Sequence, residues 1–118
     1  MFSEAMIREF FEAVNQRDLD GMGLRLDHDA EFYFPKTQPL IGRDRIQRFF
    51  KILFRQFPKL TFKVERVIVQ EQQAAVHWTN RGAGRDQKPY ENEGVTLLEW
   101  EGDKIRFMSD FFKDTGKF

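Results

Sequence analysis

An aspartate near the end of the chain, Asp110, is the residue that the sequence places best for acid-base chemistry. It lies in Met108-Ser-Asp-Phe-Phe112, a predicted strand that is rich in apolar residues. A carboxyl group among phenylalanine side chains loses hydration, and desolvation raises the pKa of an acid toward the range in which it can donate or accept a proton. Asp110 is therefore a candidate catalytic acid or base. The alternative is an aspartate that caps backbone N–H groups at a strand end.

His77 and Thr79 form a second candidate pair. They lie two residues apart in the stretch 74–81, which is predicted to be a strand, so they share one of its faces. A charged histidine beside an aspartate would lower the pKa of that acid, and it could orient the carboxyl group or share its proton. The alternative for His77 is a hydrogen bond to a neighbouring carbonyl, without any catalytic role.

The first part of the chain is predicted to be mainly helical. Apolar residues at helical spacing predict a first helix, and they are Ile7, Phe10, Phe11 and Val14. Asp18 is the candidate N-cap of a second, short helix that carries Leu26 near its end. The stretch 31–34 is predicted as a short strand that stops at Pro35, and 36–41 as a loop.

A third helix and a run of strands are predicted to follow. The apolar spacing of the helix runs from Gly42 to Pro58, which cannot continue a helix. Alternating patterns then predict strands from Leu60 to Val64 and over 74–81, 93–100 and 105–112. A hairpin loop over 82–89 and a tight turn over 101–104 separate them. Helices followed by antiparallel strands define an α+β domain.

The composition excludes several classes of protein. The chain has 118 residues, enough for one domain over 1–118, and its 19 Lys and Arg balance 19 Asp and Glu. No net field attracts a nucleic acid or an anionic membrane, and no signal peptide or membrane-spanning pattern is present, so a cytoplasmic protein is expected. With no cysteine and only two histidines, no metal or other cofactor is expected. The 14 phenylalanines suit a dense core or the wall of an apolar pocket.

A basic stripe on the third helix leads to another possible function. Arg48, Lys51 and Arg55 are spaced to lie on one flank of this helix and could attract an anionic partner. The simpler interpretation is the solvated side of an amphipathic helix, because no aromatic stacking platform accompanies the stripe.

The order of the predicted elements and four local phrases resemble a known family. The phrases are Asn15 to Gly21, Ile41 to Asp44, Pro89 to Val95 and Gly102 to Ile105. Together they resemble the SnoaL-like branch of the nuclear-transport-factor-two-like superfamily over nearly the whole chain. The resemblance implies a cone-shaped α+β fold with a deep pocket, and relatives that include polyketide cyclases, ketosteroid isomerase and limonene epoxide hydrolase. One fold hosts many functions, so each residue has to be carried over separately.

The positions at which these relatives hold their catalytic groups are mostly changed in this chain. The three isomerase groups align with Phe10, Phe34 and Thr96, none of which matches. The hydrolase network aligns with Thr79, His77 and Asp110, and its water-binding residues align with Phe32 and Phe34. Only Asp110 matches, and it resembles the pocket acid of the hydrolase and the cyclases. The family register would turn His77 and Thr79 inward beside it.

The resemblance also implies which residues contact a ligand. The side chains expected at the pocket are Phe10, Phe32, Phe34, Phe50, Thr79, Tyr90, Asn92, Thr96 and Met108. The leading hypothesis is a pocket protein for a small, apolar, oxygenated molecule, with acid-base catalysis by Asp110 and His77. The alternative is a ligand-binding or dimerisation module without catalysis. A homodimer is expected because an apolar outer sheet face needs cover, and the residues expected on that face are Val76, Trp78, Val95 and Leu97.

Overall fold

The two N-terminal helices form much as their apolar spacing predicts. In the computed structural model, which describes residues 3–84 and 86–117, α1 spans Glu4–Asn15 and α2 spans Leu19–Leu24. The side chain of Asp18 caps α2 by accepting a hydrogen bond from the Gly21 N–H at 2.9 Å, as predicted. The prediction that α2 extends to Leu26 is wrong, because Leu26 is fully buried at the start of the first strand.

The next segment contains more strand than the sequence predicted. Strand β1 spans Leu26–Tyr33 and β2 spans Leu40–Ile41, so β1 begins earlier than residue 31 and part of the predicted loop pairs with it. Helix α3 spans Arg43–Gln56 and follows Gly42, whose φ of 105° is a conformation that glycine adopts readily. The predicted third helix is confirmed.

Four long strands complete the chain where alternation predicted them. They are β3 (Thr61–Gln70), β4 (Gln73–Ala83), β5 (Pro89–Glu101) and β6 (Lys104–Phe112), followed by a single 3-10 turn, η1 (Thr115–Lys117). Strand β3 was predicted only as far as Val64 but continues to Gln70. Strands β4 and β5 are also longer than predicted and extend the hairpin into the stretch that was expected to be loop. Gly102 has a φ of 63° in the tight turn between β5 and β6, as that turn requires.

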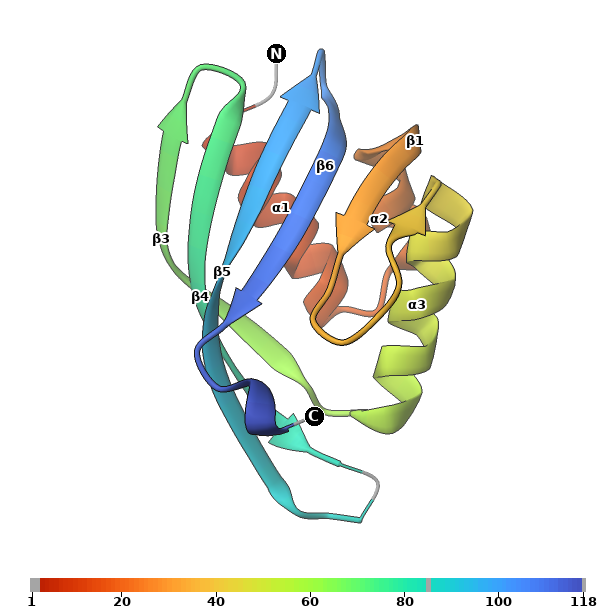
Figure 1. Ribbon diagram of the computed structural model, residues 1–118, viewed down its shortest axis with the longest axis vertical. Coiled ribbons are helices and arrows are strands. Elements are labelled where there is room, and N and C mark those ends of the chain that lie inside the picture. The colour runs from red at the N-terminus through yellow and green to blue at the C-terminus, as the bar shows by residue number, and fades with distance from the viewer. Residues whose placement is uncertain (1–2, 85, 118) are drawn as a thin grey trace.

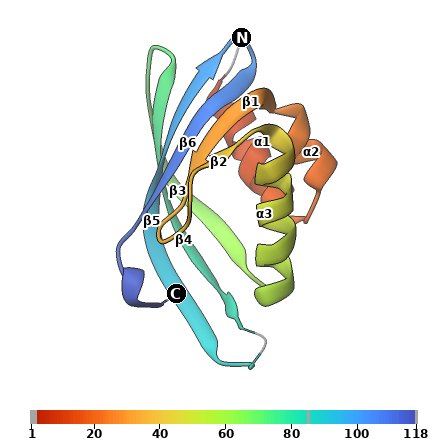
Figure 2. The same cartoon turned by 45° about the vertical axis from the view of Figure 1, so that its right-hand side comes forward.

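The strands form one curved sheet with the helices on one of its faces (Figures 1 and 2). Within the described residues the strand order is β2-β1-β6-β5-β4-β3, with β1 and β6 parallel and the other neighbours antiparallel. Helix α1 packs on β3 and α3 packs on β1. The predicted α+β class is therefore confirmed. No helix in the described part of the chain is long and apolar enough to cross a membrane.

The ladder register decides which side chains point toward the helices. Val76 pairs with Thr96, and Thr96 pairs with Asp110, so these three side chains share the inner face. Trp78 lies on the same face, and both Trp78 and Val76 are fully buried. The prediction that Val76 and Trp78 lie on the outer face is therefore wrong, because the hydrophobic core holds both of them.

The alternate side chains of each strand point to the opposite, outer face of the sheet. His77 pairs with Val95, which pairs with Phe111, and all three point away from the helices. Leu97 and Phe111 are 41% and 55% exposed on this outer face. The predictions that placed Val95 and Leu97 on the outer face are confirmed.

Candidate functional site

Three polar groups on the inner face are linked by hydrogen bonds, and the last of them is the carboxyl group of Asp110. The indole N–H of Trp78 donates to Oγ1 of Thr96 at 2.9 Å, and Thr96 Oγ1 lies 2.6 Å from Oδ1 of Asp110. An indole nitrogen can only donate, so the Thr96 oxygen accepts from Trp78, and the Thr96 hydroxyl donates its own proton to Oδ1 of Asp110. This direction leaves Oδ2 as the oxygen of Asp110 that can carry a proton.

Burial gives Asp110 an unusual affinity for that proton. The residue as a whole is half-buried, but its carboxyl group points to the helix-covered face and is enclosed by protein. Desolvation raises the pKa of Asp110 from 3.8 to about 7, against a smaller lowering effect of the Thr96 hydrogen bond. Both protonation states are therefore populated near neutral pH, which suits a general acid or base. The sequence left this direction open, because phenylalanine neighbours would raise the pKa of Asp110 and a charged His77 beside it would lower that pKa.

An apolar pocket of about 250 Å³ opens on the same side of the sheet. It lies between α3, the residues after β1 and the inner faces of β3 to β6. Its lining residues are Phe34, Pro35, Lys36, Thr37, Phe49, Ile52, Leu53, Gln56, Phe57, Leu60, Phe62, Asn80, Tyr90 and Phe112. Two of the residues predicted to contact a ligand, Phe34 and Tyr90, are in this wall. The amide of Asn80, which the sequence analysis did not single out, is there too.

Asp110 lies next to this pocket but does not line it. Phe112, two residues further along β6 on the same face, is part of the pocket wall. Its ring packs edge to face against Phe34, with the ring centroids 5.2 Å apart. Phe112 thus links the pocket wall to the strand that carries Asp110.

Most of the other predicted pocket residues belong to the packed core. Phe32 stacks on Phe50 with ring centroids 5.6 Å apart, and Phe10 and Met108 are 3% and 2% exposed within the same core. These four side chains do not line the apolar pocket beneath α3, because they pack against one another between the helices and the sheet. Thr96 is buried with Asp110 rather than in the pocket wall.

His77 does not pair with Asp110. It lies on the outer face, where its Nε2 is 2.6 Å from Oε2 of Glu93. Lys113 lies 3.4 Å from the other Glu93 oxygen, and the His77 hydrogen bond and the Lys113 charge hold the pKa of Glu93 below its usual range. The predicted pairing of His77 with Asp110 is wrong because the family register was placed one residue out on β4, and one residue reverses the face.

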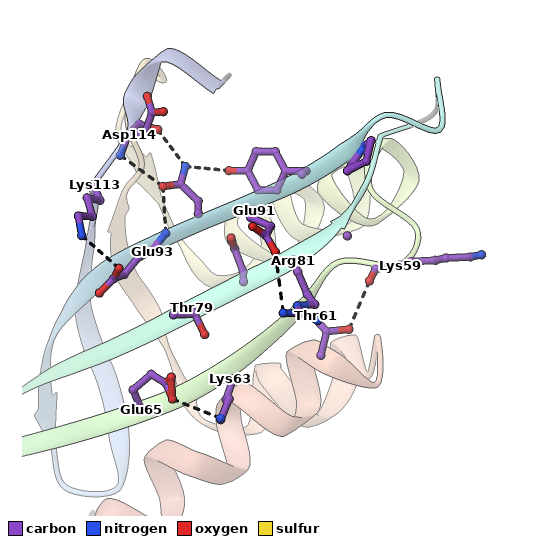
Figure 3. A pocket seen from close by; sticks show the side chains of 15 residues that line it. Lys59, Thr61, Lys63, Glu65, Thr79, Arg81, Glu91, Glu93, Lys113 and Asp114 are labelled. Carbon is purple, nitrogen blue, oxygen red and sulfur yellow. Dashed lines mark hydrogen bonds and ion pairs between the residues drawn. The ribbon is translucent and has the colours of Figure 1, made fainter.

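A wide, polar groove crosses the outer side of the sheet near the β4–β5 hairpin (Figure 3). Its volume is about 1260 Å³, and Thr79 and Asn92 contribute to its lining together with several charged side chains. Figure 3 shows Arg81 beside Glu91, and Glu93 beside Lys113. Thr79 therefore faces this groove rather than the apolar pocket. The basic stripe predicted on α3, Arg48 with Lys51 and Arg55, is exposed elsewhere.

The residues that sequence reasoning missed are Trp78 and Asn80. In Ala74-Ala-Val-His-Trp-Thr-Asn80 the apolar residues alternate through Val76 and Trp78, and this alternation already predicts that His77 and Thr79 point outward. The resemblance to the epoxide hydrolase implies the opposite orientation of these two side chains, which the β4–β5 register contradicts.

A comparison with protein families agrees with this geometry. Residues 7–108 match the SnoaL-like domain. The chain belongs to the SnoaL-like domain family. The family resemblance drawn from the sequence is therefore confirmed, and no curated protein sequence matches the chain.

Solved structures show the same fold in other SnoaL-like and NTF2-like proteins. An NTF2-like protein of unknown function from Burkholderia pseudomallei superposes with a TM-score of 0.88 at 20% identity, covering 96% of this chain and 91% of that one. A proposed SnoaL-like polyketide cyclase from Jannaschia gives 0.84 at 19% identity, covering 92% and 83%. TerC, crystallised with polyporic acid, gives 0.87 at 18% identity, covering 97% and 92%. At these identities the likeness establishes the fold alone.

Proposed function

We propose that this SnoaL-like protein binds a small, largely apolar, oxygenated molecule in the pocket beneath α3, and that Asp110 transfers a proton to or from it. The observation that carries the proposal is an enclosed acid with a pKa of about 7 beside an apolar cavity. TerC, which has the same fold, was crystallised with polyporic acid, an organic small molecule. The cytoplasmic location and the limits 1–118 stay predictions from the sequence.

The proposed chemistry needs one carboxyl group that changes protonation state during turnover. When protonated at Oδ2, Asp110 donates to a substrate oxygen that gains charge as a ring closes or an epoxide opens. When ionised, it removes a proton from a carbon next to a carbonyl group, as in an isomerisation or an aldol-type closure. The hydrogen bond from Thr96 holds Oδ1 in place, so the same oxygen serves in both directions.

The route from the pocket to Asp110 passes the rings of Phe34 and Phe112. These two residues contribute to the pocket wall and contact each other. Phe34 follows the end of β1, and Phe112 is the last residue of β6, so both rings lie where the sheet ends. In this proposal, ligand entry turns one ring aside and brings a reacting oxygen to Oδ2.

The experiment that tests the catalytic part compares the wild type with Asp110→Asn. Panels of hydroxylated ketones, epoxides and polyketide-like aromatics are screened for thermal shift and, in parallel, for product by mass spectrometry. We expect a compound that is turned over by the wild type to be bound but not converted by Asp110→Asn. Unchanged conversion by the variant would remove Asp110 from the reaction.

A second candidate function is ligand binding without catalysis. The observation that favours it is the position of Asp110 outside the pocket wall, together with His77 on the other face of the sheet. Under this function the same screen yields thermal shifts, no compound gives product, and Asp110→Asn binds as the wild type does.

We also propose that two copies of the chain pair through the outer face of the sheet. Ile68, Leu97 and Phe111 are 59%, 41% and 55% exposed there, and the helices leave this face uncovered (Figure 2). An exposed apolar face of this kind is a typical self-association surface, and a two-fold pairing would cover it symmetrically.

A further inference from the structure

We propose that the pocket selects ligands that carry a hydroxyl group, and that the buried amide of Asn80 accepts the hydrogen bond of that hydroxyl. The inference rests on the proposed binding function and names the ligand class for the same pocket. It adds a binding residue that faces the cavity from β4 and is independent of Asp110.

Asn80 has an unmet hydrogen-bonding capacity. The residue is 5% exposed and lines the pocket, and its Oδ1 has no hydrogen-bond partner among the residues that the structure describes. Among the buried side-chain oxygen and nitrogen atoms of residues 3–84 and 86–117, it alone lacks a hydrogen-bond partner. Leaving a buried acceptor unpaired costs free energy, so a partner supplied by a ligand would be favourable.

The neighbouring Asn92, on the same face, has an amide group whose oxygen and nitrogen both form hydrogen bonds. It pairs with Asn80 across the β4–β5 ladder, and both residues are buried. Its Oδ1 accepts from the backbone N–H of Glu93 at 2.9 Å, and its Nδ2 donates to the carbonyl oxygen of Asp114 at 2.9 Å. Asn92 is therefore a structural residue, whereas Asn80 contributes to the pocket wall and its amide oxygen has no such role.

Tyr90 supplies a second polar group at the pocket wall. Its hydroxyl oxygen accepts a hydrogen bond from Nδ2 of Asn92 at 3.2 Å, which leaves the hydroxyl proton for another acceptor. Desolvation raises the pKa of Tyr90, so the hydroxyl stays protonated at neutral pH. An oxygen on the ligand can therefore accept from Tyr90 while a ligand hydroxyl donates to Asn80.

The rest of the wall sets the size and character of the ligand. Aromatic and aliphatic side chains, among them Leu53, Leu60, Phe62 and Phe112, make up most of it. The volume is about 250 Å³, and an engineered apolar cavity of roughly 150 Å³ holds benzene. The geometry thus fits a one-ring or compact two-ring molecule with a hydroxyl group.

The test uses two probes of the same shape, p-cresol and p-xylene, which differ by a hydroxyl in place of a methyl group. Dissociation constants are measured by calorimetry for the wild type, Asn80→Leu and the control Thr79→Val. Thr79 adjoins Asn80 on β4 but points to the other face. The ratio of the two constants is compared between proteins, because that comparison cancels the different hydrophobicity of the probes.

We expect the preference for p-cresol over p-xylene to fall about five- to tenfold in Asn80→Leu, which is the effect of one hydrogen bond, and to stay unchanged in Thr79→Val. Binding of both probes with the same ratio in the wild type and Asn80→Leu overturns this inference and leaves the proposed function standing. Binding of neither probe to the wild type overturns both. If Asn80→Leu does not fold, the smaller Asn80→Ala variant carries the same comparison, with the same result expected and the same result overturning it.

Discussion

The hydroxyl of Thr96 donates a hydrogen bond to Oδ1 of Asp110 across the β5–β6 ladder, with 2.6 Å between the two oxygen atoms. The Thr96 oxygen in turn accepts a hydrogen bond from the indole N–H of Trp78 at 2.9 Å. Thr96 on β5, itself bonded to Trp78 on β4, therefore positions the carboxyl group of Asp110 on the inner face. The enclosure of that carboxyl group, rather than any charged partner, raises its pKa.

The raised pKa of Asp110 predicts that the protein loses stability as the pH rises. Between the unfolded pKa of 3.8 and the folded value of about 7, the folded carboxyl group holds a proton that the unfolded one has lost. The stabilisation is therefore complete below pH 3.8 and is lost as the pH rises through about 7. From pH 5 to pH 8 we expect the free energy of unfolding to fall by about 2 to 3 kcal/mol from this group. Urea denaturation at both pH values measures the change.

Asp110→Asn is the variant that isolates this contribution. It cannot ionise, so its stability should be less dependent on pH over the same range, and it should gain on the wild type at pH 8. The matched control is Asp103→Asn in the exposed turn between β5 and β6, which should keep the wild-type pH dependence. Parallel curves for Asp110→Asn and the wild type would show that Asp110 is not a buried, protonated acid.

Thr96 variants test the hydrogen bond that lowers the pKa of Asp110. Thr96→Val removes the donor, so the pKa of Asp110 should rise further, and the buried indole N–H of Trp78 loses its acceptor. An unsatisfied buried donor costs about 1–3 kcal/mol, so this variant should also be less stable. Thr96→Ser keeps the hydroxyl and should retain most of both properties. NMR titration of the Asp110 carboxyl carbon follows the pKa, and a value in Thr96→Val at or below that of the wild type would contradict the directed bond.

The outer-face pair of His77 and Glu93 is predicted to be independent of the site. His77→Gln removes the imidazole that bonds to Glu93, so the pKa of Glu93 should rise toward its ordinary value. The titration of Asp110 and the binding of p-cresol should not change, since the sheet separates the two faces. NMR titration of both carboxyl groups in one sample makes the comparison. A shift of the Asp110 titration in His77→Gln would mean that the two faces are coupled.

Two buried asparagines should respond in opposite ways to the same substitution. Asn80→Leu replaces an amide with an unpaired oxygen, so the ligand-free protein should be as stable as the wild type or more stable. Asn92→Leu removes hydrogen bonds to Glu93 and Asp114 and should lower the free energy of unfolding by about 1–3 kcal/mol. Thermal and urea unfolding of the two variants side by side provide the measurement. Equal destabilisation of both would show that the Asn80 amide has a structural partner.

The proposed pairing of two chains is tested by a charge on the outer face. Phe111→Glu places a carboxylate on the exposed apolar surface that Phe111 forms with Leu97, and it should convert a dimer to a monomer in analytical ultracentrifugation. Lys51→Glu, on the exposed side of α3, should leave the association state unchanged. A wild-type protein that sediments as a monomer at high concentration would rule out the pairing.

The sequence predicted the elements better than the register. Helical spacing placed α1 and α3 correctly, and the side chain of Asp18 begins α2, because these signals are local. Alternation placed four strands, but β2 has only two residues and depends on pairing with β1, which no local pattern reveals. Local signals thus define long elements, while short edge strands depend on contacts distant in sequence.

The same distinction applies to the candidate site: local features could be predicted from the sequence, and the register could not. Asp110 could be singled out because it lies in an apolar strand, and Phe112, two residues further on, shares its inner face. The partnership of Asp110 with Thr96 and Trp78 does not follow from the family resemblance, which turns His77 inward and Trp78 outward; a shift of one residue on β4 reverses both. The apolar alternation through Val76 and Trp78 predicts the correct orientation, because large apolar side chains take the covered face of a sheet that is covered on one side only. The orphan oxygen of Asn80 is a property of three-dimensional packing alone.

The most direct test of the account is to locate a bound probe. In an NMR titration with p-cresol, we expect the largest shifts at the methyl groups of Leu53 and Leu60 and at the ring of Phe112, which line the pocket beneath α3. Shifts confined to outer-face residues such as Val95 and Leu97, with the pocket residues unchanged at saturating probe, would contradict it.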